Sequence, residues 1–430
     1  MKLELHRLLV KKLAFGDKTG FSGGTLTVNK KELLDLIAED PLLGKNLDVE
    51  LAMPGESVRI MPVKDVIEPR WKIEGKGQVF PGILSDVETV GEGKTLVLTG
   101  AAVVTTGKLV RFQEGIIDMT GPGSDYTPYS KTCNVVLVLE PSDPDMDKHD
   151  YEHACRMAGI KAAGYLAKAC ADVKADKVDA YECANLREAM NALPNLPKVG
   201  YLYMLQTQGL LHDTYLYGVD VKKILPTLLS PLEVMDGAIV SGNCVSACDK
   251  NSTYVHLNNP IIADMLKRHG KDFNFVTCII TNENVTLADK RRSSSYATKL
   301  AAMLGLDGVV ISEEGFGNPD ADLIMNCWKC ERQGIKTTLM TDEYAGQDGA
   351  SQSLADSCPE GNACVTAGNA NEVIVLPPMK KVIGYAEEAN VIAGGWNGSL
   401  ASDGTITVEL QAITGATSEL GYTKLGAYTL

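Results

Sequence analysis

The spacing of hydrophobic positions divides the chain near residue 120. Before this point, short apolar runs are broken by glycine and proline, which predicts a strand-rich region. The run 25–28 predicts a strand, and Asn29 followed three positions later by Glu32 predicts the start of a helix. The runs 49–52 and 58–61 flank a Pro-Gly pair, which predicts a hairpin with a type II turn.

Longer apolar runs begin just before residue 120. The run 96–104 predicts one buried strand, and the continuous run 135–139 predicts a strand covered on both faces. The alanines that follow at 154, 158 and 162 have helical spacing. The run 199–205 returns to a strand pattern, so this part of the chain predicts a βαβ-like unit.

The second half repeats the alternation of strand and helix more regularly. Strands are predicted at 275–281, 309–312, 337–340 and 373–376, with helices at 296–304 and 322–333 between them. The right-handed crossover rule makes this a parallel, doubly wound sheet. We therefore expect an α/β protein with a strand-rich N-terminal domain (1–120), an α/β segment (121–243) and a second α/β domain (244–430).

Polar side chains follow three of the predicted parallel strands. They are Asn282 and Glu283, then Glu314 and Asn318, then Asp342 and Glu343. Ligands of open parallel sheets bind beyond the carboxyl ends of the strands. We therefore expect these six residues to form a polar pocket for a small zwitterionic molecule.

The segment 236–249 contains a dipeptide with unusual chemical potential, Asn243-Cys244. Asparagine and the preceding glycine tolerate strained backbone conformations. A strained peptide before a thiol favours an N→S acyl shift, in which the thiol attacks the preceding carbonyl. β-Elimination then cuts the chain, and hydrolysis leaves a pyruvoyl group.

Several polar residues near this dipeptide are candidates to assist cleavage or to bind substrate. They are Ser241, Gly242, Asp249, Lys250, Asn251, His212 and His256. Either histidine has the chemistry of a general base.

Composition narrows the possible partners and locations. The chain has 430 residues, of which 45% are hydrophobic, and a formal net charge of −14. The acidic balance argues against nucleic-acid or anionic-membrane partners. The chain has no run of 18 apolar residues and begins with a charged segment rather than a secretory leader. We expect a cytoplasmic protein that does not bind membranes.

The eleven cysteines are scattered and predict no disulfide framework. The segment 327–330 has C-x-x-C spacing but lies within a helical pattern. Cys244, Cys248, Asp249 and His256 lack the usual spacing of zinc ligands. No glycine-rich segment fits a nucleotide-binding pattern. We therefore predict neither a metal nor a nucleotide.

Long motifs are distributed along the whole chain. They are the segments 54–59, 100–108, 115–118, 241–251, 254–260, 281–284, 314–320, 342–346, 348–356 and 411–417. This set strongly resembles the proprotein of component B of glycine/sarcosine/betaine reductase. The resemblance implies cleavage before Cys244, giving chains 1–243 and 244–430, and conversion of Cys244 to a pyruvoyl group.

In that family the pyruvoyl carbonyl is expected to bind the substrate amine as a Schiff base. A selenolate then displaces the amine, and acetyl phosphate is eventually formed. Glycine is the substrate we expect first and sarcosine second, because the quaternary ammonium of betaine cannot form an imine. The implied partners are a selenocysteine-containing gamma subunit, with two copies of each chain, selenoprotein component A and component C, with electrons from thioredoxin.

Two other interpretations remain open. The chain would be an uncleaved, non-catalytic substrate-binding or scaffold subunit if Cys244 is a structural thiol. It would be a metal-dependent hydrolase if Cys244, Cys248 and His256 held zinc.

Overall fold

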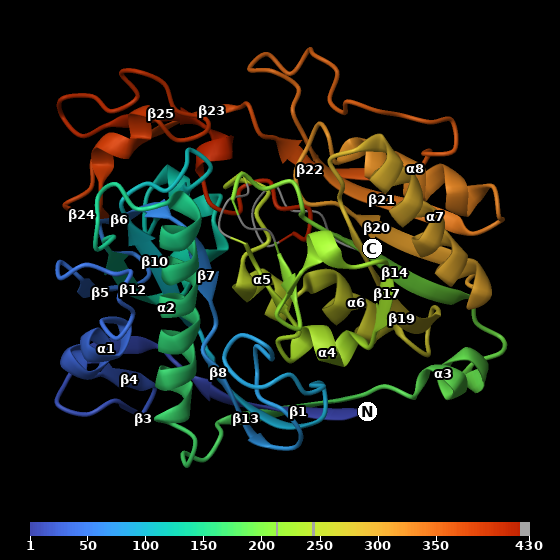
Figure 1. Cartoon of the computed structure of the whole chain (residues 1–430), viewed down its shortest axis with the longest axis horizontal. Coiled ribbons are helices and arrows are strands. Elements are labelled where there is room, and N and C mark those ends of the chain that lie inside the picture. Colours follow the sequence, from blue (N-terminus) through green and yellow to red (C-terminus); the bar gives the residue numbers. More distant parts are fainter. Residues whose placement is uncertain (212–213, 243–245, 422–430) are drawn as a thin grey trace.

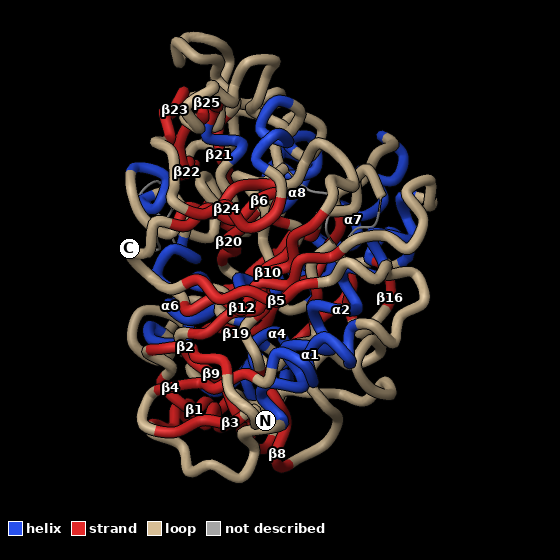
Figure 2. The backbone as a smooth tube through the Cα atoms, turned by 90° about the vertical axis from the view of Figure 1, so that its left-hand side faces the viewer, coloured by secondary structure: helices blue, strands red, loops and turns tan. Residues whose placement is uncertain are grey.

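The computed structural model describes residues 1–211, 214–242 and 246–421. Figure 1 shows a strand-rich N-terminal region, in blue and cyan, beside a layered region in green, gold and orange. Figure 2, viewed from the side, shows strands running through the middle of the molecule with helices around them. This mixed architecture confirms the predicted α/β class.

The N-terminal region consists of small sheets. In pairing order, one four-stranded sheet contains β13 (Lys177–Glu182), β1 (Lys2–Leu9), β9 (Gly93–Thr99) and β8 (Arg70–Glu74). The other contains β5 (Asp48–Ala52), β12 (Cys133–Leu139), β10 (Ala101–Gly107) and β7 (Asp65–Ile67). The three-stranded sheets contain β11 (Gly115–Asp118), β6 (Val58–Val63) and β24 (Lys381–Gly384), and β2 (Lys12–Phe15), β4 (Thr25–Val28) and β3 (Gly20–Ser22).

The predicted strand 25–28 and the helix start at Asn29 are confirmed, whereas the predicted hairpin and the single strand 96–104 are wrong. Helix α1 (Lys30–Ile37) begins with the Asn29 side chain accepting a hydrogen bond from the Glu32 amide. However, β5 pairs with β12, and β6 pairs with β11 and β24, so the two strands form no hairpin. The run 96–104 is two strands in two sheets, β9 and β10. The chain turns between them at Gly100, which has a φ of 87°.

The predicted βαβ unit is also wrong. The predicted second strand, 199–205, belongs to a different sheet from β12, and β13 comes between it and helix α2 (Lys148–Lys168). The helix packs on β10 and β7, which share the sheet of β12, and on β8. A Cβ at Gly159 would lie 2.7 Å from the Thr105 side chain, so the helix approaches β10 closely. Helical spacing predicted α2 and its buried face, and α2 covers the sheet of β12, but the chain does not return to that sheet after the helix.

A six-stranded sheet forms the core of the second region. In pairing order its strands are β17 (Thr227–Leu229), β19 (Asn274–Asn282), β14 (Lys198–Leu205), β20 (Gly308–Ser312), β21 (Lys336–Glu343) and β22 (Cys364–Asn369). All neighbours are parallel except β17 and β19. The chain adds β19 on one side of β14 and then β20, β21 and β22 on the other. The sheet is therefore doubly wound, as predicted, and its winding reverses at β14.

Helices cover both faces of this sheet (Figure 1). The helices α7 (Leu287–Met303) and α8 (Asp320–Glu331) pack on the face that carries Leu202 and Met204. The helices α4 (Pro231–Met235), α5 (Thr253–Leu257) and α6 (Pro260–Arg268) pack on the face that carries Tyr201, Tyr203 and Leu205. Successive side chains of β14 alternate between two apolar cores, so the strand is buried on both sides.

The remaining elements surround these sheets. They are α3 (Leu186–Ala192), β15 (Tyr215–Leu216), β16 (Val219–Asp220), β18 (Ile239–Val240), β23 (Val373–Leu376) and β25 (Ile406–Glu409). Strand β23 was predicted, but it pairs antiparallel with β25 rather than joining the parallel sheet. The division of the chain at residues 120 and 243 stays a prediction. Among the helices of the described ranges, none combines the length and apolar character needed to cross a membrane.

Candidate active site

Acidic side chains gather beyond the carboxyl ends of the parallel strands, around the point where the winding reverses. The carboxyl cluster, as we call it, consists of six buried residues: Asp249, Glu283, Glu313, Glu314, Asp342 and Glu419. Glu283, Glu314 and Asp342 were predicted to lie at this edge, and Asp249 was predicted to be near the cleavage segment. The structure brings these two sets together.

Glu314 joins several of the surrounding segments. Its amide donates a hydrogen bond to Glu283 Oε1 at 2.7 Å, and its carbonyl oxygen accepts one from Gln206 Nε2 at 3.2 Å. Its Oε1 atom accepts a hydrogen bond from the Asn251 amide at 2.9 Å. The ends of β14, β19 and β20 are therefore tied to the segment that follows residue 246.

The other members of the cluster are held by neutral side chains. Asn251 Nδ2 donates to Glu419 Oε1 at 2.9 Å, and Thr417 Oγ1 donates to Asp342 Oδ2 at 2.8 Å. Thr341 Oγ1 donates to Glu313. Since these donors carry no charge, they position the carboxyl groups without neutralising them.

Burial raises the pKa of every carboxyl group in the cluster, because the charged form loses its hydration. The pKa of Glu314 rises to about 8, although the positive charge of Lys250 opposes the rise. Neighbouring carboxylates raise the pKa of Glu283 and Asp342 further. At neutral pH the cluster therefore retains protons or requires nearby positive charge.

Lys250 and Ser241 fix the backbone just before the predicted cleavage point. Lys250 is buried, and its Nζ atom donates a hydrogen bond to the Gly242 carbonyl oxygen. Ser241 Oγ donates to the same oxygen at 3.0 Å. Asn243 and Cys244 lie outside the described residues.

A second anchor reaches this segment from β7. The Ser241 amide donates to Thr253 Oγ1 at 3.1 Å, and that hydroxyl donates to Asp65 Oδ2 at 2.7 Å. The Thr253 amide also donates to Asp65 Oδ1 at 3.1 Å. The buried carboxyl group of Asp65 thereby connects the N-terminal sheets to the segment that ends at Gly242.

His256 lies in a buried site on α5. Its Nδ1 atom is 2.7 Å from the hydroxyl oxygen of Tyr203. Burial, together with the charge of Lys250, lowers the pKa of His256 to about 3, so the ring is neutral at pH 7. The other candidate histidine, His212, is not among the described residues.

Three predicted pocket residues lie away from the carboxyl cluster. Asn318 is exposed, and Glu343 is half-buried, accepting a hydrogen bond from Thr366 on the neighbouring strand. Asn282 is buried but faces the opposite way from Glu283. Its Nδ2 atom donates to the Val221 carbonyl at 2.9 Å.

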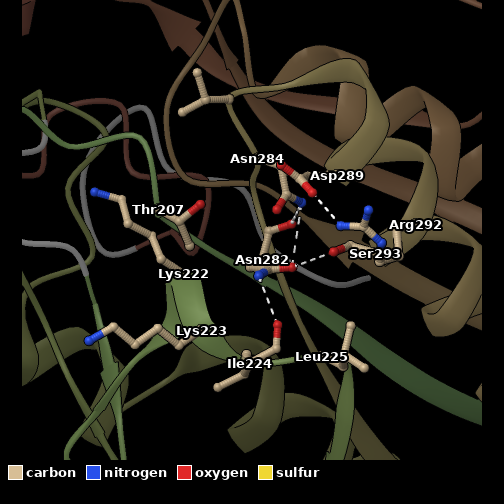
Figure 3. Close-up of a pocket in the computed structure, with 11 residues that line it drawn as sticks. Thr207, Lys222, Lys223, Ile224, Leu225, Asn282, Asn284, Asp289, Arg292 and Ser293 are labelled. Carbon is tan, nitrogen blue, oxygen red and sulfur yellow. Dashed lines mark hydrogen bonds and ion pairs between the residues drawn. The ribbon is translucent and has the colours of Figure 1, made fainter.

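A cavity of about 360 Å³ lies on the side that Asn282 faces, and no member of the carboxyl cluster lines it. Figure 3 shows Asn282 and Asn284 beside Ser293 and the Asp289–Arg292 ion pair. The same cavity is lined by Lys222, Lys223 and Thr207. Thr207 follows Gln206, which contacts Glu314, so the ends of β14 and β19 separate this cavity from the carboxyl cluster.

Sequence reasoning missed several residues of this region, including Gln206, Glu419 and Asp65. Glu419 follows the motif 411–417, which was a signal that this segment belongs to the site. Asp65 offered no such signal, because it lies in a short strand far away in the sequence.

Comparison with known proteins identifies relatives over the whole length of the chain. The family model described as glycine/sarcosine/betaine reductase component B subunits matches residues 1–428. The chain is 63% identical to the glycine reductase complex component B subunits alpha and beta of Acetoanaerobium sticklandii, over 100% of both chains. It is 53% identical to the sarcosine reductase complex component B subunit alpha of Peptoclostridium acidaminophilum, over 99% of both.

A distant relative adds one further observation. The D-proline reductase proprotein PrdA of Acetoanaerobium sticklandii is 21% identical over 79% of this chain and 54% of its own length. No solved structure matches the chain. The full-length family match and the high identities show that this chain belongs to the glycine/sarcosine/betaine reductase component B subunit family, and that it is a component of an oxidoreductase complex.

Proposed function

We propose that the chain is the alpha/beta proprotein of a glycine reductase component B, and that it cleaves itself before Cys244 to form a pyruvoyl group. The observation that carries the proposal is the fixed carbonyl of Gly242, held by Lys250 and Ser241 in a buried polar site. The family match and the word proprotein in the name of the D-proline relative support it.

The residues around the segment fit the requirements of an N→S acyl shift. The thiol of Cys244 must reach the Asn243 carbonyl, so the backbone on its N-terminal side must be held in one orientation. Lys250, Ser241 and Thr253 supply that restraint. The pKa of Asp249 rises to about 7, so at neutral pH about half of the molecules carry a proton there that can pass to a leaving group.

The carboxyl cluster fits a substrate that carries a positive charge. A pyruvoyl carbonyl would supply an electrophile for the amine of a glycine-type substrate. Glu283, Glu314 and Asp342 would then stabilise positive charge on the substrate nitrogen by a preorganised field. Glycine is the preferred substrate, because the identity to the glycine reductase subunits is 63% and that to the sarcosine reductase subunit is 53%.

The same proposal includes the partners. The cleaved chains would assemble in the cytoplasm with a selenocysteine-containing gamma subunit, as two copies of each. They would act together with selenoprotein component A and component C. Neither a nucleotide nor nucleic acid takes part.

Intact-mass analysis of the protein from its native host tests the proposal. We expect two chains, 1–243 and 244–430, with the smaller one modified by a carbonyl reagent. Borohydride in the presence of glycine should trap substrate on that same chain. A single uncut chain with a free Cys244 thiol would contradict the proposal and favour the scaffold interpretation. So would full reductase activity of Cys244→Ala in the reconstituted complex.

A further inference from the structure

One side of the carboxyl cluster contains a thiol. The Cys248 Sγ atom and carboxylate oxygens of Asp249 and Asp342 all lie within 4.8 Å of one another, and the three residues are buried. In a tetrahedral zinc site a sulfur and an oxygen ligand lie about 3.5 Å apart, since a Zn–S bond is about 2.3 Å long and a Zn–O bond about 2.0–2.2 Å. The Cys248 Sγ atom and Asp249 Oδ1 are already 3.8 Å apart, so these two groups need to move little to share one ion.

The two carboxyl groups have unused acceptor atoms. Within the described part of the chain, Asp249 Oδ2 and Asp342 Oδ1 have no hydrogen-bond partner, although both atoms are buried. A buried oxygen without a partner is unfavourable, because the hydration that it lost is not replaced. The other oxygen of Asp342, Oδ2, accepts a hydrogen bond from Thr417, so the direction of the free Oδ1 atom is fixed.

The backbone that carries the thiol is fixed as well. The Thr417 amide donates to the Cys248 carbonyl oxygen at 3.0 Å, and the Gly415 amide donates to the Ala247 carbonyl oxygen at 2.7 Å. Asp342 lies at the end of β21 in the parallel sheet. Two rigid elements therefore present the three donor groups to one another.

The charge balance of the cluster favours a cation there. Among the described residues around the six carboxyl groups there is one buried lysine, Lys250. Its ammonium group already donates a hydrogen bond to the Gly242 carbonyl oxygen. A thiolate with two carboxylates suits a cation of borderline softness rather than Mg²⁺ or Ca²⁺, which prefer oxygen ligands only.

We propose that Cys248, Asp249 and Asp342 bind a divalent cation of the Zn²⁺ class, with the fourth position open as in catalytic zinc sites. On binding, the Cys248 thiol and whichever of the Asp249 and Asp342 carboxyl groups are protonated release their protons to solvent, and the sulfur and the carboxylate oxygens bond to the metal with no change in oxidation state. These ligands differ from the zinc ligands considered from the sequence, which included His256, because the His256 ring contacts the Tyr203 hydroxyl instead. It also departs from the prediction that the chain holds no metal.

The test uses the full chain, purified under reducing conditions, stripped with a chelator and titrated with Co²⁺. Cobalt bound to a thiolate gives a sulfur-to-metal charge-transfer band in the near ultraviolet. We expect one equivalent per chain. Cys248→Ser should abolish the band, and Asp342→Asn should weaken binding by at least about tenfold, the least that even an outer partner of a metal ligand contributes.

Two controls separate this site from other thiols and from the proposed cleavage. Cys278→Ser removes a buried thiol in β19 and should leave the band unchanged. Cys244→Ala, which blocks pyruvoyl formation, should also leave the band unchanged, so that failure of either proposal can be recognised separately. Circular dichroism identifies any variant that does not fold, and elemental analysis of the untreated wild-type chain for zinc is independent of all variants.

The proposal is overturned if the wild-type chain gives no cobalt band and contains no stoichiometric metal. In that case protons or the substrate ammonium would balance the carboxyl cluster. It is also overturned if a folded Cys248→Ser chain keeps the band, or if Asp342→Asn binds cobalt as tightly as the wild type.

Discussion

Lys250 donates a hydrogen bond from its buried ammonium group to the carbonyl oxygen of Gly242, eight residues earlier in the chain. The contact joins the described residues on either side of Asn243-Cys244. It also places a positive charge near the carboxyl groups of Asp65 and Glu314, whose pKa values it lowers against the larger effect of burial. One side chain thus serves both the backbone and the charge balance of the site.

Lys250→Gln should slow cleavage before Cys244 by about 100-fold, because misplacing a reacting group by about 1 Å has an effect of that size. The fraction of cut chain, followed by intact mass after expression, measures the rate. Lys223→Gln, which changes an exposed lysine of the neighbouring cavity, is the matched control and should cleave normally. Equal cleavage of both variants would remove Lys250 from the mechanism.

Thr253→Val should lower the free energy of unfolding by about 1–3 kcal/mol, because it leaves the buried Asp65 carboxyl group without its hydroxyl donor. The two side chains have similar shapes, so little packing is lost. Urea denaturation measures the change. At the exposed Thr89, the same substitution should alter stability by no more than about 0.5 kcal/mol.

His256 should make the protein sensitive to acid. Its pKa is about 3 in the folded protein and 6.5 in the absence of burial. Between these values the unfolded chain binds a proton that the folded chain does not, so stability falls as pH decreases from 6.5. The expected contribution is about 1.4 kcal/mol per pH unit.

The check compares urea midpoints at several pH values below 6.5. His256→Gln should show a shallower loss of stability than the wild type. His149→Gln, at an exposed position on α2, should follow the wild type. Parallel curves for all three proteins would show that His256 is not the group responsible.

Gly384→Ala should destabilise the protein by at least about 2 kcal/mol. Its φ is 102°, a conformation unfavourable for other residues, and a Cβ there would lie 2.0 Å from the Met61 carbonyl oxygen. Gly20→Ala is the matched control, because nothing lies within 4 Å of its Cβ position. A small effect at both positions would mean that β24 shifts on β6 without loss.

Much of the site could be predicted because strand ends are visible in sequence. The apolar runs at β14, β19, β20 and β21 indicated where each strand stops, and Glu283, Glu314 and Asp342 follow directly. Adjacent residues point to opposite sides of a strand, and the sequence does not tell which of the two sides faces the cluster. Thus Glu283 joins the cluster, whereas Asn282 lines the cavity.

Long-range pairing limited the prediction of the fold. The hairpin between β5 and β6 and the βαβ unit through α2 were inferred from neighbours in sequence. The structure instead pairs β6 with β24, more than 300 positions later, and β13 with β1. Local patterns give the type of an element, whereas its partner depends on the packing of the whole chain. Asp65 reaches the site through such a long-range contact, between β7 and Thr253.

The order of strands in the six-stranded sheet has a consequence for biosynthesis. The central strand β14 precedes Cys244, whereas β19 and β20, which lie on its two sides, follow it. A chain cut at this bond after folding would stay in one piece, like a nicked protein whose fragments share a core. If the proposed cleavage occurs, translation as a single polypeptide gives equal amounts of the two fragments and lets them meet without diffusion. Genes encoding the two fragments separately should therefore give insoluble products unless they are co-expressed, because each fragment alone would expose an uncovered half of a sheet.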